Sequence, residues 1–149
     1  MERILPIHPS KSFDCYHDSL THHYAAPVFY DALEREISFA KREGNLVGIV
    51  KFALPEDTSE DQLLYFANEL ELSVRQHDLI SRIGTREFAV LLRLDTEIQS
   101  ACECLITRIK KSEKRRFHYG FVMTDGTKGL LQVLEELDNP QILHLANTL

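Results

Sequence analysis

The chain has 149 residues, 44% of them hydrophobic and 27% charged, and a formal net charge of −6 at pH 7. This composition supports one folded domain with a real core, argues against general disorder, and disfavours a broad nucleic-acid-binding face. The first residues lack the long apolar stretch typical of a secretory signal, no apolar run approaches the roughly 20 residues of a membrane span, and the number of cysteines is odd. We therefore expect a cytoplasmic protein without a disulfide framework.

The N-terminal part divides into an arm and the start of a domain. Residues 1–17 carry two prolines and little periodicity, so we expect an irregular arm, with the domain over residues 18–149. Asp18-Ser19-Leu20-Thr21 predicts an ordered turn. Apolar residues then recur about every four positions over 27–42, which predicts a helix that Gly44 ends.

The rest of the chain alternates short apolar runs with helical patterns. The runs are typical of buried strands, and Pro, Gly, Asp and Ser mark the boundaries between elements. The expected elements are a strand at 46–54, a helix from a Thr58 or Ser59 N-cap to about 76, hairpin strands at 79–83 and 87–94, a helix from Asp95 to about 111, a strand at 117–124, a helix at 129–138 and an edge strand within 141–149.

The inner β-α-β-β-α-β order is the ferredoxin-like plan, in which helices pack on one face of a sheet. We therefore expect an α/β (α+β) fold with a mostly antiparallel central sheet flanked by helices. No internal repeat or low-complexity tract interrupts this plan.

Three segments resemble the GGDEF (diguanylate cyclase) family over about residues 18–138. Gly84-Thr85-Arg86-Glu87-Phe88, with Arg82 before it and an apolar strand after it, resembles the signature hairpin Arg-x-Gly-Gly-Asp/Glu-Glu-Phe. The turn at 18–21 matches the entry motif Asp-x-Leu-Thr. Arg75-Gln76-His77-Asp78 matches the allosteric Arg-x-x-Asp motif at its usual spacing. The resemblance implies a nucleotidyl-cyclase type of sandwich and a role in bacterial signalling.

The same resemblance implies that the chemistry of the family is missing. Family members join two GTP molecules into cyclic di-GMP with two magnesium ions, held by acids on the first strand and in the signature. The matching residues here are Lys51 and Arg86, and Thr85 replaces the second signature glycine. Hard divalent cations need oxygen ligands. We therefore expect a degenerate domain that is not an enzyme, with no catalytic residue, no metal ligand and no cofactor.

The guanine pocket of the family is also altered. Residues 54–61 form a loop shorter than that of the family, and the guanine-reading Asn has no counterpart, although Asp61 matches the guanine-reading Asp. One interpretation of the function is therefore that the domain binds GTP without turning it over.

Both ends of the allosteric motif are intact, and in the family they bind cyclic di-GMP. An arginine can donate two hydrogen bonds to guanine O6 and N7, and an aspartate can accept from N1 and N2. We expect Arg75 and Asp78 to form such a site, completed by a second arginine among Arg108, Arg115 and Arg116. The structural alternative is a surface ion pair that contributes little to stability.

The leading hypothesis is a catalytically inactive cyclic di-GMP receptor. The alternative is a module that binds a protein partner or forms a homodimer, with no nucleotide ligand. Two further groups stay open. The basic run at 108–116 is a solvated helix end or a phosphate-facing patch, and the Cys15, His17, Asp18, His22 and His23 group fits exposed turn histidines better than a zinc pattern.

Overall fold

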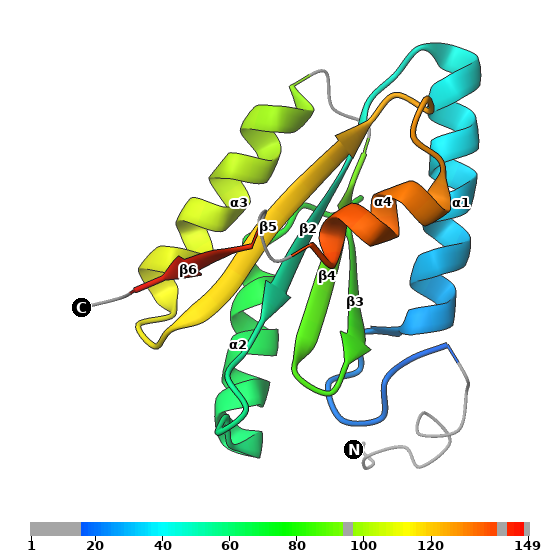
Figure 1. Ribbon diagram of the computed structural model, residues 1–149. Helices are drawn as coiled ribbons and strands as arrows, with labels where there is room; N and C mark the ends of the chain where they lie inside the picture. Colours follow the sequence, from blue (N-terminus) through cyan, green and yellow to red (C-terminus); the bar gives the residue numbers. More distant parts are fainter. Residues whose placement is uncertain (1–15, 94–96, 140–142, 148–149) are drawn as a thin grey trace.

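A six-stranded sheet lies at the centre of the molecule, and two helices cover each of its faces (Figure 1). The computed structural model describes residues 16–93, 97–139 and 143–147. The strands are β1 (Tyr24–Ala25), β2 (Val47–Ala53), β3 (Leu79–Gly84), β4 (Glu87–Leu92), β5 (Phe117–Thr124) and β6 (His144–Ala146), in the spatial order β1-β3-β4-β2-β5-β6. The helices are α1 (Ala26–Glu43), α2 (Glu60–Ser73), α3 (Ile98–Ser112) and α4 (Leu130–Leu137).

The predicted α+β fold with a mostly antiparallel sheet is confirmed. Among the described strands, only the short β1 runs parallel to its neighbour β3, and the other pairs are antiparallel. The inner helices α2 and α3 pack on one face, as the ferredoxin-like plan predicts, and α1 and α4 cover the other. No helix in the described ranges has both the length and the apolar character needed to cross a bilayer.

The central strand β2 is buried from both sides. Val50 and Phe52 point into the core under α2 and α3, while Val47 and Ile49 point toward α1 and α4. Successive side chains of a strand alternate between the faces of the sheet, so Lys51 lies on the α1 and α4 side with Ile49. A charged residue therefore stands at a position that the fold itself buries.

Local signals explain the end of α1 and the start of α2. α1 ends at Gly44, which adopts φ = 72° and donates its N–H to the Ala40 carbonyl. α2 begins with a capping box between Ser59 and Gln62, so Ser59 rather than Thr58 is the N-cap. This helix ends at Ser73, before the expected residue 76, because the next residue is already extended.

Some expectations fall on residues outside the described ranges. Asp95, expected to start the third helix, is one of them, and α3 begins at Ile98 after Glu97. The expected N-terminal arm lies almost wholly outside them as well, since the description starts at residue 16. The last residue of that segment, His17, forms an isolated bridge with Tyr24.

Gly48 allows α3 to lie close to β2. A methyl group at this position would stand 2.7 Å from both Cys102 Sγ and Ile98 Cγ2. We expect Gly48→Ala to lower the free energy of unfolding by about 1–3 kcal/mol, because the helix must move or its side chains must leave their rotamers. Urea unfolding measures this loss. In a Cys102→Ala background the loss should shrink, and an equal loss in both backgrounds would contradict the packing argument.

Candidate functional site

The entry turn and the signature hairpin form one hydrogen-bonded unit. Asp18 accepts from the N–H and the hydroxyl of Thr21 at 2.8 and 2.9 Å. Arg82 Nη1 lies 3.1 Å from both oxygens of Asp18, and its Nη2 donates to the Thr85 carbonyl at 2.7 Å. Burial disfavours ionisation of Asp18, but the Thr21 and Arg82 hydrogen bonds outweigh it and lower the pKa of this carboxyl. Two motifs 64 residues apart thus hold each other in place.

Lys51 is the buried cation of this region, with 4% of its surface exposed. Its Nζ donates to Asp138 Oδ1 at 2.9 Å and lies 3.8 Å from Glu87 Oε2. Asp138 directly follows α4, and Glu87 opens β4 on the same face of the sheet. The ammonium therefore occupies the space between two carboxylates, beside the hairpin.

The remaining signature residues divide between core and surface. Phe88 is fully buried and packs in the α2 and α3 core, as expected. Thr85 is exposed at the tip of the hairpin. The Arg86 carbonyl accepts from the Leu54 N–H at 2.8 Å, while its guanidinium has no ion-pair partner in the part of the chain that the structure describes. A Cβ at Gly84 would stand 3.1 Å from Glu87 Oε1, so this glycine lets the Glu87 side chain fold back on the turn.

Arg75 and Asp78 face each other at the end of α2. Arg75 Nε and Nη2 donate to the two oxygens of Asp78 at 3.2 and 3.0 Å, and the Arg75 N–H adds a third bond at 3.0 Å. The Asp78 side chain is only 3% exposed and that of Arg75 is 32% exposed. The pair is thus partly buried and bidentate, which makes it stronger than the surface pair that sequence reasoning allowed.

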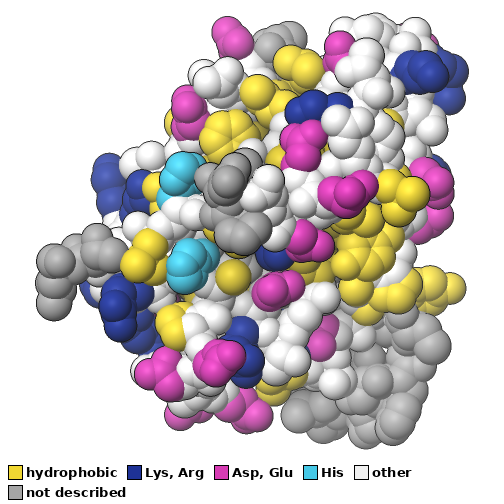
Figure 2. All heavy atoms as spheres, in the orientation of Figure 1, with side chains coloured by type: hydrophobic (Ala, Val, Ile, Leu, Met, Phe, Trp, Pro, Cys, Tyr) yellow, Lys and Arg dark blue, Asp and Glu magenta, His cyan; other side chains and the backbone are white. Residues whose placement is uncertain are grey.

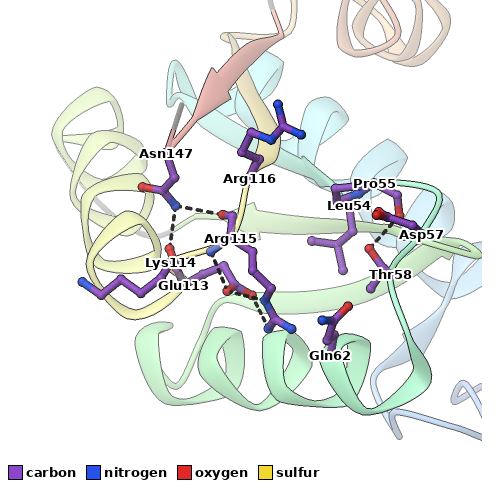
Figure 3. A pocket seen from close by; sticks show the side chains of 10 residues that line it. All are labelled: Leu54, Pro55, Asp57, Thr58, Gln62, Glu113, Lys114, Arg115, Arg116 and Asn147. Atoms are coloured by element: carbon purple, nitrogen blue, oxygen red, sulfur yellow. Dashed lines mark hydrogen bonds and ion pairs between the residues drawn. The ribbon is translucent and has the colours of Figure 1, made fainter. Parts of the chain in front are cut away.

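Arg108 is the only one of the three candidate second arginines to reach this pair. It lines a cavity of about 260 Å³ together with Arg75 and Asp78, and its Nη1 donates to the Ser73 carbonyl at 2.9 Å. Arg115 and Arg116 instead line a separate cavity of about 730 Å³, formed by other loops (Figure 3).

The histidine-rich stretch matches the expected exposed group only in part, since His22 is exposed but His23 is buried. His23 is only 6% exposed, because the pairing of β1 with β3 places the preceding turn against the core. The centroids of the His23 and Phe88 rings lie 5.9 Å apart in an edge-to-face arrangement. Its Nδ1 has no hydrogen-bond partner in the described residues. Burial lowers the pKa of this imidazole, with His22 acting in the same direction and Glu71 and Asp18 opposing it. No group of three or more His, Cys, Asp or Glu in the described ranges is arranged to hold a metal ion.

No protein-family model and no curated protein matches the sequence. Solved structures do match the fold. The GGDEF domain of DgcB from Caulobacter crescentus, in complex with c-di-GMP, superposes with a TM-score of 0.73 at 17% identity and covers 84% of each chain. The FimX GGDEF domain from Pseudomonas aeruginosa gives 0.72 at 15% identity over 82% of this chain and 88% of the other.

A third match includes a protein partner. Diguanylate cyclase SiaD from Pseudomonas aeruginosa, in complex with its activator SiaC, gives a TM-score of 0.73 at 18% identity, over 87% of this chain and 58% of SiaD. At these identities the likeness establishes a shared fold.

The buried His23 predicts that stability falls with acidity. Because its pKa is lowered in the folded state, the unfolded chain binds more protons below about pH 6.5, and the free energy of unfolding decreases as the pH drops through that value. Urea unfolding between pH 7 and 5 measures the slope. His23→Gln should reduce it, whereas His118→Gln, at an exposed position, should not. Identical slopes for His23→Gln and wild type would contradict the assignment.

Proposed function

We propose that this chain, which has the fold of GGDEF domains, is a non-catalytic domain that recognises cyclic di-GMP through Arg75 and Asp78. The observation that carries the proposal is the buried Lys51 ammonium, 2.9 Å from Asp138 Oδ1 and 3.8 Å from Glu87 Oε2. It stands at the position that the resemblance matches to a metal-binding acid.

The electrostatics of this position oppose a divalent ion. Magnesium needs oxygen ligands in a nearly octahedral shell. Asp138 and Glu87 provide carboxylates, but both already face the ammonium of Lys51. A divalent ion at the same place would meet a buried like charge. Arg86 adds a second cation in the same hairpin, where the family pattern has an acid. Without the metal, GTP has no centre to neutralise its phosphates and activate a nucleophile.

The Arg75 and Asp78 pair supports recognition. In the folded protein the guanidinium and the carboxylate satisfy each other, so a guanine would have to replace that pairing with its own. Guanine offers O6 and N7 to the arginine and its N1 and N2 donors to the aspartate, and therefore replaces both partners at once. The bond from the Arg75 N–H to Asp78 keeps the carboxylate in position during this exchange.

Arg108 would extend the site toward the phosphates. It lines the same cavity, and its guanidinium suits phosphate oxygens. The cavity measures about 260 Å³, below the 300–1,000 Å³ typical of small-molecule sites. One guanine of cyclic di-GMP with its phosphate would fill this cavity. The second guanine would then lie outside it, where it could contact another protein surface. The bound DgcB domain has the same fold. Cyclic di-GMP would then bridge two domains and change the choice of partner.

Calorimetric titration of cyclic di-GMP tests the assignment. We expect heat with the wild type and at least tenfold weaker binding for Arg75→Gln and Asp78→Asn, because each removes a charged hydrogen-bonding partner. Arg108→Gln should weaken binding less. Arg116→Gln is the matched control, since it removes one exposed arginine from the other cavity. Urea unfolding must accompany the titration, because Arg75→Gln leaves a buried carboxylate unpaired.

Equal affinities of all these variants for cyclic di-GMP, or no heat at tens of micromolar, would reject the receptor function and favour the second candidate function, a protein-interaction module.

A hydrophobic area over α4 and α1 supports the protein-interaction module (Figure 2). On α4, Leu131 is 76% exposed, and Leu130 and Leu134 are partly buried. Concentration-dependent sedimentation without nucleotide would then be the expected behaviour.

Restoring acids should restore a metal site. We expect millimolar Mg²⁺ or Mn²⁺ to raise the Tm of the double variant Lys51→Asp with Arg86→Glu, by roughly 2–4 °C for each kcal/mol of binding free energy. The wild type should not respond. Lys41→Asp with Arg42→Glu makes the same charge change in the last turn of α1 and is the control. A thermal shift of the wild type as large as that of the double variant would show that Lys51 does not exclude the metal.

A further inference from the structure

A second cavity, of about 730 Å³, lies between the β2–α2 loop and the α3–β5 loop (Figure 3). It shares no lining residue with the cavity at Arg75 and Asp78, and it includes neither Lys51 nor the signature hairpin. Its size is within the range typical of small-molecule sites. The cavity is therefore a separate part of the molecule, which the proposed function does not use.

The loop at 113–116 forms one wall and is held rigidly. Glu113 is 3% exposed and accepts from Arg115 Nε and Nη2 at 3.0 and 2.8 Å, and from the Arg115 N–H at 3.2 Å. Asn147, after β6, donates its Nδ2 to the carbonyls of Glu113 and Arg115 at 2.6 and 3.0 Å. The hydrogen bond to Glu113 raises the pKa of Arg115 despite partial burial. The wall thus presents a fixed cation.

Three cations follow one another in this wall: Lys114, Arg115 and Arg116. Glu113 compensates only Arg115. Lys114 and Arg116 are exposed and have no ion-pair partner in the described ranges. Figure 3 shows Arg115 reaching toward Gln62, while the other two side chains leave the loop in different directions. Because neighbouring like charges repel, a preformed loop that keeps three of them favours an anion.

The opposite wall differs in chemistry. Leu54 and Pro55 give it an apolar surface, and the Gln62 Oε1 is occupied by the Ser59 N–H, which leaves the Nε2 amide to donate. Asp57 also lines this wall and would repel an anion, so the negative group must lie on the side of Arg115. One side of the cavity therefore suits a phosphate and the other a flat, weakly polar group.

We propose that this cavity binds a small organic phosphate of nucleotide size. Arg115, whose side chain runs toward Gln62, would hold the phosphate oxygens, because a guanidinium matches their geometry, and Lys114 and Arg116 would add to the positive potential of this wall. The ring system of the ligand would lie on Leu54 and Pro55 and accept a hydrogen bond from Gln62. The basic run of the sequence is then a phosphate-facing patch rather than only a solvated loop.

Titration followed by ¹H–¹⁵N NMR tests this site, with ADP, pyrophosphate and adenosine as probes in a buffer without phosphate. We expect ADP to shift the amide signals of residues 114–116 and the side-chain amides of Gln62 and Asn147. Pyrophosphate should reach only the basic loop, and adenosine should bind much more weakly than ADP. Lys114→Gln with Arg116→Gln should weaken ADP binding severalfold without unfolding the protein, because it lowers the positive potential of the wall and both side chains are exposed.

Lys41→Gln with Arg42→Gln is the matched control, because it removes two exposed cations from α1 on the other face of the sheet. It should leave ADP binding unchanged. Equal weakening by both pairs of substitutions, shifts spread over the whole surface, or no shifts at millimolar ADP would overturn the proposal. Arg75→Gln should keep ADP binding, so a failure at this cavity is distinguishable from a failure of cyclic di-GMP recognition.

Discussion

The burial of one ammonium group on the central strand constrains much of this structure. Lys51 lies where helices cover both faces of the sheet, and a charge in such a place must be paired. Its ammonium forms ion pairs with Asp138, which follows α4, and with Glu87, which begins β4. The cation thereby ties the last helix to the hairpin. Both carboxylates thereby face the same buried ammonium.

Arg82 and Phe88 of the hairpin each have a structural role that does not involve catalysis. Arg82 clamps Asp18 of the entry turn and the Thr85 carbonyl of the hairpin, and Phe88 fills the core. These residues shape the turn whether or not chemistry follows. The hairpin therefore has a structural basis of its own, and the fold as a whole matches solved structures at 15–18% identity.

Sequence reasoning reached the fold because the signals were local. The capping box at Ser59, the left-handed Gly44 and the apolar runs each lie within a few residues. It also brought Arg75 and Asp78 together, three residues apart. It missed Asp138, which meets Lys51 from 87 residues away, and it placed His23 in solvent. Both depend on tertiary packing, which no short window of sequence contains.

The hydrogen bonds from Asn147 join the final strand to a loop more than thirty residues earlier. The wall that carries the three cations is therefore completed only when β6 has docked at the edge of the sheet. Trimming the chain ahead of this asparagine, or tethering a fusion partner tightly to that end, would loosen the basic loop while both hydrophobic cores stayed whole. The shape of the basic loop thus depends on a side chain that is remote along the polypeptide.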